Sequence, residues 1–180
     1  MLYSAEYESP IGKLTLVSNE KALIGLWMDG QRYFGSSLPN EFTFEKSAPV
    51  LESAVSWLKA YFAGEKPSLD NLPLEPQGTA FRQSVWNALL DIPYGTTITY
   101  SALAQRLSDE SGLFVSPRAV GNAVGHNPIS ILIPCHRVVG ANGLLTGYAG
   151  GLERKKWLLE HEGSGRENVV ELSGLTFDFK

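Results

Sequence analysis

The first third of the chain alternates apolar and polar positions with the period of β-strands. Three segments of this kind, residues 2–9, 13–18 and 22–28, are separated by the turn signals Pro-Ile-Gly at 10–12 and Asn-Glu at 19–20. Strand-like segments joined by such short turns are typical of antiparallel pairing. The pattern therefore predicts an antiparallel meander.

The period of the apolar positions then becomes helical. Phe42 and Phe44, on either side of Thr43, first suggest one more short strand. A helix is expected between Ser47, which would cap its start, and Gly64, which would stop it. The apolar residues in this range follow helical spacing: Val50, Leu51, Ala54, Val55, Leu58, Tyr61 and Phe62. We therefore expect these first residues to form a small α/β unit.

A segment rich in proline separates this unit from the rest of the chain. Residues 64–78 contain three prolines and two glycines and show no apolar periodicity, which is typical of a linker. We place a boundary near residue 77. Residues 1–77 are then one domain with its linker, residues 78–163 are a second domain, and residues 164–180 are a tail to which the pattern assigns no role.

Polar caps in the second half mark the starts of three helices. Thr99 begins a helix over residues 100–107, and Ser116 begins another in which Pro117 takes the favoured first position. Thr79 begins the earliest one, and its apolar positions are Phe81, Val85, Trp86, Leu89 and Leu90. A last helix is expected near the end of the second domain, at about 153–161. This half is therefore mostly helical.

Residues 108–115 join two of these helices in the manner of a helix-turn-helix, although an αα-hairpin packed for structure alone has the same shape. The later helix, which ends at Gly125, carries Ala119, Gly121 and Ala123 on an expected small face. Glycine inside a helix costs about 1 kcal/mol relative to alanine. We therefore expect a close approach to this backbone, either by another helix or by the wall of a DNA groove.

Composition and charge narrow the class of protein. No run of about 18 apolar residues occurs, and residues 1–10 are acidic and lack a signal-peptide core, so we expect a cytoplasmic protein without a membrane segment. The net charge is −4, with 6 basic and 10 acidic side chains in residues 1–77 but 7 and 6 in residues 78–163. Any DNA binding should therefore be moderate.

Cys135 is the only cysteine, which excludes an internal disulfide and a zinc site of the multi-cysteine type. The three histidines show no metal-ligand spacing. A lone cysteine is ordinarily a small buried hydrophobic residue. However, His136 and Arg137 follow directly, and a base and a cation on the same segment can favour the reactive thiolate. With an orienting carboxylate from elsewhere, this arrangement fits a hydrolase as well as a transferase.

Longer motifs distinguish between these classes. The chain resembles the methylated-DNA–protein-cysteine methyltransferases, also called O6-alkylguanine-DNA alkyltransferases, continuously over residues 78–163. The matching motifs are the active-site IPCHRV at 133–138, the recognition helix RAVGNA at 118–123, the hinge NP at 127–128, the active-site loop GYAGG at 147–151 and the closing WLLEHEG at 157–163. Residues 1–77 match only in general layout, that of a ribonuclease-H-like α/β domain. The implied fold class is α/β (α+β), with a helix-turn-helix in the second domain.

The resemblance implies a chemical role for five residues. Cys135 accepts the alkyl group, His136 removes the thiol proton through a water, and Glu162 holds and polarises His136. Tyr100 donates a hydrogen bond or proton to the leaving guanine, because a neutral guanine leaves more readily than its anion. Asn127 links the helix-turn-helix to the site by hydrogen bonds.

The resemblance also implies how the damaged base is reached. The base must leave the duplex, and the planar cation of Arg118 would fill the gap in the stack. The small helix face would then sit in the minor groove, whose poor sequence code suits a protein that scans any sequence. The implied DNA- and base-contacting residues are Arg118, Ala119, Gly121, Asn122, Ala123, Pro134, Arg137, Tyr148, Ala149 and Gly150. A surface arginine and close helix packing are the structural alternatives.

The implied function is DNA repair by direct reversal, with one irreversible transfer to Cys135 from O6-alkylguanine and also from O4-alkylthymine. The implied partner is double-stranded DNA, without a cofactor. No metal is expected, because the cysteines that bind an N-terminal zinc in some relatives are absent. We expect a monomer, and the sequence leaves cooperative binding along DNA open. Two features depart from the family: residues 108–115 are about four residues longer, and Ala149 stands where some relatives have serine.

Two other functions remain to be separated from this one. A Cys-His hydrolase would need an oxyanion hole and would turn over many times. A DNA-binding sensor would recognise alkylated bases without accepting the group. Relatives of that last kind have another residue in place of the cysteine, so the presence of Cys135 weighs against a sensor.

Overall fold

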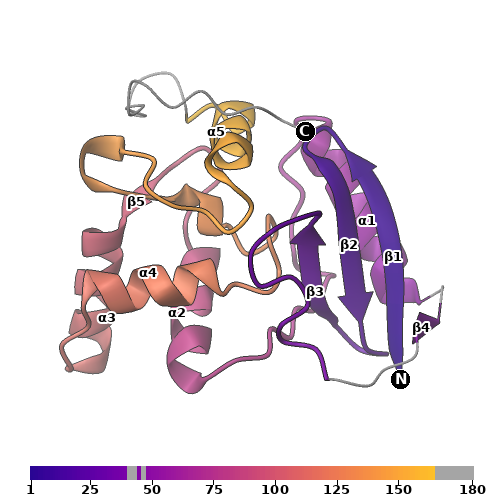
Figure 1. Ribbon diagram of the computed structural model, residues 1–180, viewed down its shortest axis with the longest axis horizontal. Coiled ribbons are helices and arrows are strands. Elements are labelled where there is room, and N and C mark those ends of the chain that lie inside the picture. The colour runs from indigo at the N-terminus through magenta and orange to yellow at the C-terminus, as the bar shows by residue number, and fades with distance from the viewer. Residues whose placement is uncertain (40–43, 46–47, 165–180) are drawn as a thin grey trace.

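The computed structural model describes residues 1–39, 44–45 and 48–164 (Figure 1). In Figure 1 a small sheet backed by a helix lies to one side and a group of shorter helices to the other. Among the described residues, no helix is both long and apolar enough to cross a membrane. The predicted fold class, a sheet unit followed by a helical unit, is confirmed.

The sheet forms from the first strands of the chain. Antiparallel pairing joins β1 (Leu2–Ser9) to β2 (Gly12–Ser18) and β2 to β3 (Leu23–Met28), which confirms the predicted meander. The short β4 (Phe44–Glu45) pairs in parallel with β1, so the strand order is β3-β2-β1-β4. β4 coincides with the end of the further strand suggested by the sequence, and the rest of that segment lies outside the described residues.

Helix α1 (Pro49–Phe62) packs on one face of this sheet (Figure 1). The expected cap Ser47 lies outside the described residues. Ala48 occupies the N-cap position, followed by Pro49, which has no N–H to leave unsatisfied. Gly64 follows the helix with φ of +87°, a conformation that glycine adopts without strain. The buried face of α1 is formed by Leu51, Ala54, Leu58 and Tyr61.

The edge of β3 is covered by backbone from the linker and from the second half of the chain. The N–H of Leu23 donates to the carbonyl of Pro73, and the N–H of Glu75 donates to the carbonyl of Leu23. Leu26 makes a similar bridge to the segment around Ile129. Unpaired strand edges invite aggregation, so these pairings satisfy the edge and join the two halves.

The second half contains short helices around a two-stranded parallel ribbon. Its elements are α2 (Ala80–Leu90), β5 (Ile98–Thr99), α3 (Tyr100–Ser111), α4 (Pro117–Gly125), β6 (Val138–Val139) and α5 (Leu152–His161), with single 3-10 turns at Cys135–Arg137 and Ala141–Gly143. The side chains of Thr79, Thr99 and Ser116 each accept a hydrogen bond from a backbone N–H in the first turn that follows. All three predicted caps are confirmed.

One expectation about the ends of these helices is wrong. α3 continues to Ser111, one turn beyond the predicted end, because Ser108 bonds to the Ala104 carbonyl within the helix and also receives the N–H of Val115. The αL residue Gly112 then ends the helix. Phe81 and Leu90, two of the apolar positions of α2, lie at its ends and are 38% and 40% exposed.

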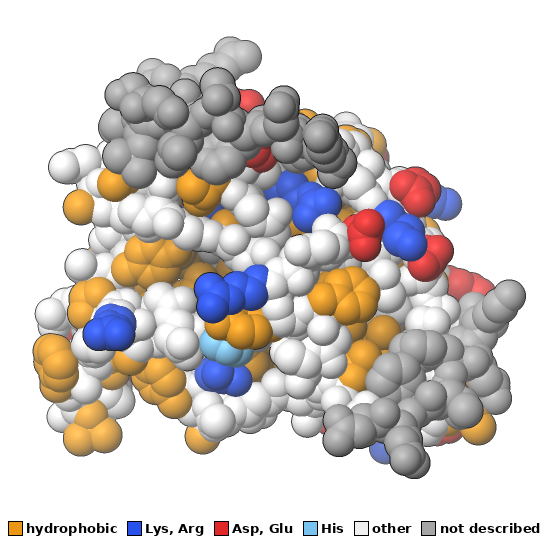
Figure 2. All heavy atoms as spheres, in the orientation of Figure 1, with side chains coloured by type: hydrophobic (Ala, Val, Ile, Leu, Met, Phe, Trp, Pro, Cys, Tyr) orange, Lys and Arg blue, Asp and Glu red, His pale blue; other side chains and the backbone are white. Residues whose placement is uncertain are grey.

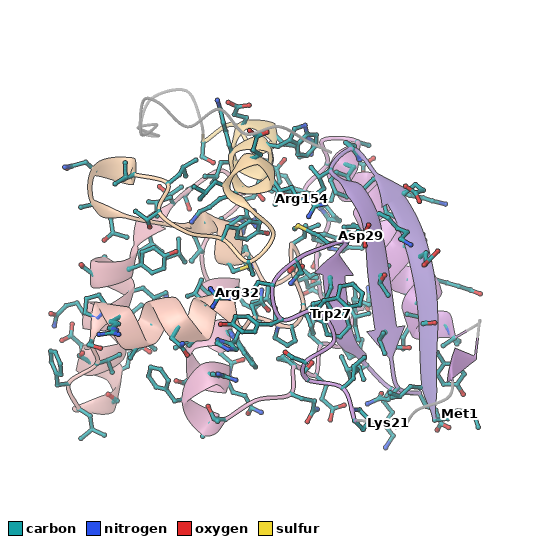
Figure 3. The ribbon with its side chains drawn as sticks, viewed as in Figure 1. Met1, Lys21, Trp27, Asp29, Arg32 and Arg154 are labelled. Carbon is teal, nitrogen blue, oxygen red and sulfur yellow. The ribbon has the colours of Figure 1, made fainter. Side chains whose placement is uncertain are left out.

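The two halves share one apolar core. Met28 and Leu58 from the first half belong to the same buried cluster as Leu89 and Leu158 from the second. Arg154 on α5 reinforces this contact, because its guanidinium donates to backbone carbonyls of the first half, including that of Asp29 at 2.9 Å (Figure 3). The boundary near residue 77 remains a prediction about domain organisation.

Candidate active site

Cys135 lies in a 3-10 turn at the end of a buried apolar segment and is only 4% exposed. Within that segment Ile131 has φ of +72°, which is uncommon for a β-branched residue. The Asn127 amide holds the segment in this shape by donating to the carbonyls of Ile129 (3.3 Å) and Ile133 (2.8 Å). Asn127 therefore connects the end of α4 to the cysteine turn.

His136 and Glu162 meet in the protein interior. His136 Nε2 lies 2.6 Å from Glu162 Oε1, and both side chains are fully buried. Because a carboxylate accepts hydrogen bonds, Nε2 carries the imidazole proton and Nδ1 carries the lone pair. Nδ1 is buried and has no hydrogen-bond partner within the described part of the chain. The pair thus leaves a basic nitrogen available.

The Glu162 carboxylate has several further donors. Arg137 donates through Nε (2.8 Å) and Nη2 (3.1 Å), the Tyr61 hydroxyl donates at 2.7 Å, and the Gly95 N–H donates at 3.3 Å. Burial by itself raises the pKa of Glu162, but the hydrogen bonds and charges of His136 and Arg137 outweigh burial and lower the pKa. Glu162 is therefore a carboxylate at neutral pH.

Burial determines the charge state of His136. It lowers the pKa of His136, and the neighbouring Glu162 only partly offsets this effect. His136 is therefore neutral at pH 7 and can accept a proton, as a general base must.

Burial and the neighbouring polar groups have opposite effects on the pKa of the Cys135 thiol. Burial raises the pKa of the thiol, whereas the Asn127 amide, the Lys155 cation and the Tyr148 hydroxyl favour the thiolate. The buried Tyr148 hydroxyl has no hydrogen-bond partner among the described residues, so it is available to donate to the thiolate. The resting group is therefore a protonated thiol surrounded by groups that stabilise its anion.

Lys155 on α5 was not among the residues expected from the sequence. It is fully buried, its Nζ donates to the Gly147 carbonyl at 2.9 Å, and it lies 5.7 Å from the centroid of the Tyr100 ring. Burial lowers the pKa of Lys155 to about 8, and Cys135 acts in the opposite direction. One sequence signal could have indicated its burial. Lys155 precedes the buried Leu158 and Glu162 at helical spacing, which places the three residues on one face.

A pocket of about 230 Å³ opens between α4, the start of α3, the loop after β3 and the segment 147–149. Tyr100 and Tyr148, the two tyrosines whose pKa values Cys135 helps to raise, both line it. Burial is the main cause for Tyr100 and, with Cys135, raises its pKa to about 12. The structure brings together here five of the expected residues: Tyr100, Gly121, Asn122, Tyr148 and Ala149.

The expected DNA-contacting face of α4 is only partly exposed. Arg118 and Asn122 are exposed, and Ala119 and Gly121 are partly exposed. Ala123 is 1% exposed, because it faces the core and its carbonyl accepts the Trp86 indole N–H at 2.8 Å. Its surface is therefore turned inward in this structure, and the predicted contact of Ala123 with DNA is not tested by it.

Three other residues expected to contact DNA or the base do not line the pocket. The Arg137 guanidinium donates to Glu162 and to the Ile92 carbonyl, and its contact with DNA remains a prediction. Pro134 is buried, and it borders a separate hollow beside Arg137. Gly150 packs so closely that a Cβ would lie 2.5 Å from Met28 Sδ, which explains the glycine by packing, and its contact with the base remains a prediction.

The described residues contain no group of three or more His, Cys, Asp or Glu side chains arranged to hold a metal ion. The fold and the site together define a two-part protein in which a sheet unit supports a helical unit with a buried thiol, a His-Glu pair and an adjacent pocket. These features rest on residues from 61 to 162, so both halves contribute to the site.

Comparison with known proteins identifies the family. The model of the 6-O-methylguanine DNA methyltransferase DNA binding domain matches residues 80–164, and that of its ribonuclease-like domain matches residues 2–76. A methylated-DNA–protein-cysteine methyltransferase of Methanosarcina acetivorans is 46% identical over 167 residues, covering 91% of this chain and 99% of the relative. The chain belongs to the 6-O-methylguanine DNA methyltransferase family, which confirms the resemblance seen in its motifs.

Solved structures agree with this assignment. The O6-methylguanine methyltransferase of Mycobacterium tuberculosis is 46% identical and superposes with a TM-score of 0.76, covering 91% of this chain and 94% of that one. The protein of the same organism in complex with DNA gives 45% identity and a TM-score of 0.77 over the same shares.

Proposed function

We propose that this protein repairs alkylated DNA by direct reversal, moving the alkyl group from O6 of guanine to Cys135 in a single irreversible turnover. The observation that carries the proposal is the position of the thiol, which interacts with Tyr100 and Tyr148, two residues that line the pocket, and with the buried Lys155. A nucleophile so placed can reach a group on a base held in the pocket.

The proposed step is a displacement at carbon. His136 Nδ1 accepts the thiol proton, through a water if the two groups are not in direct contact, and the sulfur forms a bond to the alkyl carbon. The bond between that carbon and O6 breaks, and its electron pair returns to the guanine. The Tyr100 hydroxyl donates a hydrogen bond to the ring and stabilises the charge that develops there, and a proton equivalent to the one lost by the thiol is returned to the base, so that neutral guanine leaves. The product is a thioether, and Cys135 is not regenerated.

The raised pKa of Tyr100 fits this role. A hydroxyl whose pKa is about 12 stays protonated at neutral pH and can donate to the base throughout the reaction. Thr99 caps α3 at the residue before Tyr100, so the start of a stable helix fixes the direction of this donor.

DNA is the proposed partner, as it is for the Mycobacterium tuberculosis relative in its complex. The exposed Arg118 at the start of α4 would replace the flipped base in the stack, while the exposed Asn122 and partly exposed Ala119 and Gly121 would lie along the minor groove. We also propose that the protein acts as a monomer.

The rival activity, a Cys-His hydrolase, is tested by stoichiometry. The protein is mixed with an excess of duplex DNA containing O6-methylguanine, and repaired guanine is counted over time. A single-use acceptor gives a plateau at about one methyl group removed per protein. Continued release beyond that number would show turnover and reject the transferase mechanism, and no repair at all would leave only a sensor.

A further inference from the structure

The loop after β3 brings side chains of the first domain to the mouth of the pocket. Arg32 and Tyr33 line this pocket together with residues of α4 and of the segment 147–149. Figure 3 shows Arg32 beside the end of α4, far from Lys21 at the other end of the sheet. In Figure 2, basic side chains gather there around a histidine and a hydrophobic side chain.

Several contacts hold this loop in place. The Arg32 N–H donates to the Ala149 carbonyl at 2.9 Å, which joins the loop to the active-site segment. The Tyr33 ring stacks on His126 with 3.9 Å between centroids, and His126 Nδ1 is bonded to the Asn122 carbonyl at 2.7 Å. Tyr33 has φ of +63°, a costly conformation for this residue type that persists only where surrounding contacts maintain it.

The guanidinium of Arg32 is not used within the protein. It is exposed and lies 4.9 Å from the centroid of the Tyr33 ring, which supports it from one side. Within the described residues it makes no ion pair and no side-chain hydrogen bond. Its N–H donors are therefore available to an acceptor outside the chain.

The position of Arg32 indicates what that acceptor is. When a base occupies the pocket, its own sugar and phosphate must lie at the mouth, where Arg32 stands. Guanidinium groups bind phosphate oxygens through paired, charge-assisted hydrogen bonds. The first 77 residues carry 6 basic and 10 acidic side chains, so this domain would otherwise repel DNA.

We propose that Arg32 binds a DNA phosphate next to the flipped nucleotide, which makes the first domain part of the DNA-binding surface. This inference rests on the proposed function and adds a contact outside the helix-turn-helix. Arg32 is a binding residue and takes no part in the chemical step.

The test compares Arg32→Ala, Arg32→Lys and the control Lys21→Ala, which removes an exposed cation from the same domain. Second-order transfer rates are measured with duplex DNA containing O6-methylguanine at several salt concentrations, and with the free O6-methylguanine base. Arg32→Ala should react roughly tenfold more slowly with duplex at low salt, and the slope of log rate against log salt should fall by about 0.9. Arg32→Lys should retain most of the duplex rate and most of the salt dependence. The rate with the free base should be the same for all three variants and the unmutated protein.

Equal duplex rates for Arg32→Ala and Lys21→Ala would overturn the inference, and so would an equal loss with the free base, which would assign Arg32 to the pocket itself. Failure of the unmutated protein to transfer any methyl group would instead reject the proposed function. The affinity of the same variants for undamaged duplex DNA would then still decide whether Arg32 contacts phosphate.

Discussion

At the scale of single residues, the reactivity of Cys135 depends on how its neighbours are charged. Burial disfavours the thiolate, and a buried lysine beside it compensates. His136 stays neutral because burial lowers its pKa, while Glu162 stays ionised because donors surround it. Cys135, His136 and Glu162 could be named from sequence motifs. Lys155 lies outside these motifs, and its helical spacing to Leu158 and Glu162 is a weak signal because a lysine is ordinarily solvent-exposed.

Replacing Lys155 should expose its electrostatic role. Lys155→Met removes the cation that lowers the pKa of Cys135, so the rise of transfer rate with pH should move to higher pH. Each unit of that shift slows transfer at pH 7 about tenfold. The pH–rate profile with the free base measures this, with Lys156→Met as the matched control. Because methionine suits an apolar interior, stability should not fall. Superimposable profiles for the two variants would refute the role.

At the scale of elements, α4 combines packing with an exposed surface. Its start could be predicted from the sequence, because Ser116 caps the helix and Pro117 occupies its first position, and both effects are local. The sequence did not show which of its small residues face outward, because the direction of a helix face depends on what packs against it. Ala123 meets the core, whereas Gly121 faces the pocket. The extra turn of α3 was missed for a related reason, because Ser108 is stabilised by a distant N–H.

Gly121→Ala should separate stability from function. A Cβ at this position would lie 3.8 Å from the Tyr100 ring, an ordinary contact, so alanine fits and should stabilise α4 by about 0.5–1 kcal/mol. The added methyl group would narrow the pocket and the DNA-facing surface, so transfer from duplex DNA should slow several-fold. Thermal unfolding and single-turnover rates measure the two effects. A more stable variant with unchanged transfer would show that the glycine is not needed for substrate.

At the scale of the whole molecule, the first domain is part of the site. Tyr61 on α1 donates to Glu162, and the loop after β3 reaches the pocket. The meander and α1 were predictable from periodicity, which is local information. Their contacts with residues about 100 positions later were not, because sequence spacing carries no information about such distant pairs.

Tyr61→Phe should weaken this connection between the domains. It removes a buried donor from Glu162, at a cost of about 1–3 kcal/mol in stability. The pKa of Glu162 is lowered in the folded protein, so this contribution is present near neutral pH and lost on acidification. The stability difference from the unmutated protein should therefore shrink only in strongly acid solution, as pH falls through the lowered pKa of Glu162, well below its ordinary value of about 4. Tyr94→Phe, whose hydroxyl makes only a 3.5 Å bond to the His161 carbonyl, is the control. A pH-independent difference would show that Tyr61 acts by packing alone.

The most direct measurement concerns the fate of the alkyl group. The protein is incubated with duplex DNA containing O6-methylguanine, and its intact mass and peptide masses are determined. We predict a gain of one methyl group, located on the peptide that contains Cys135, and no gain for Cys135→Ser. Repaired DNA accompanied by an unmodified protein, or by a methyl group on another residue, would contradict the assignment of Cys135 as the acceptor.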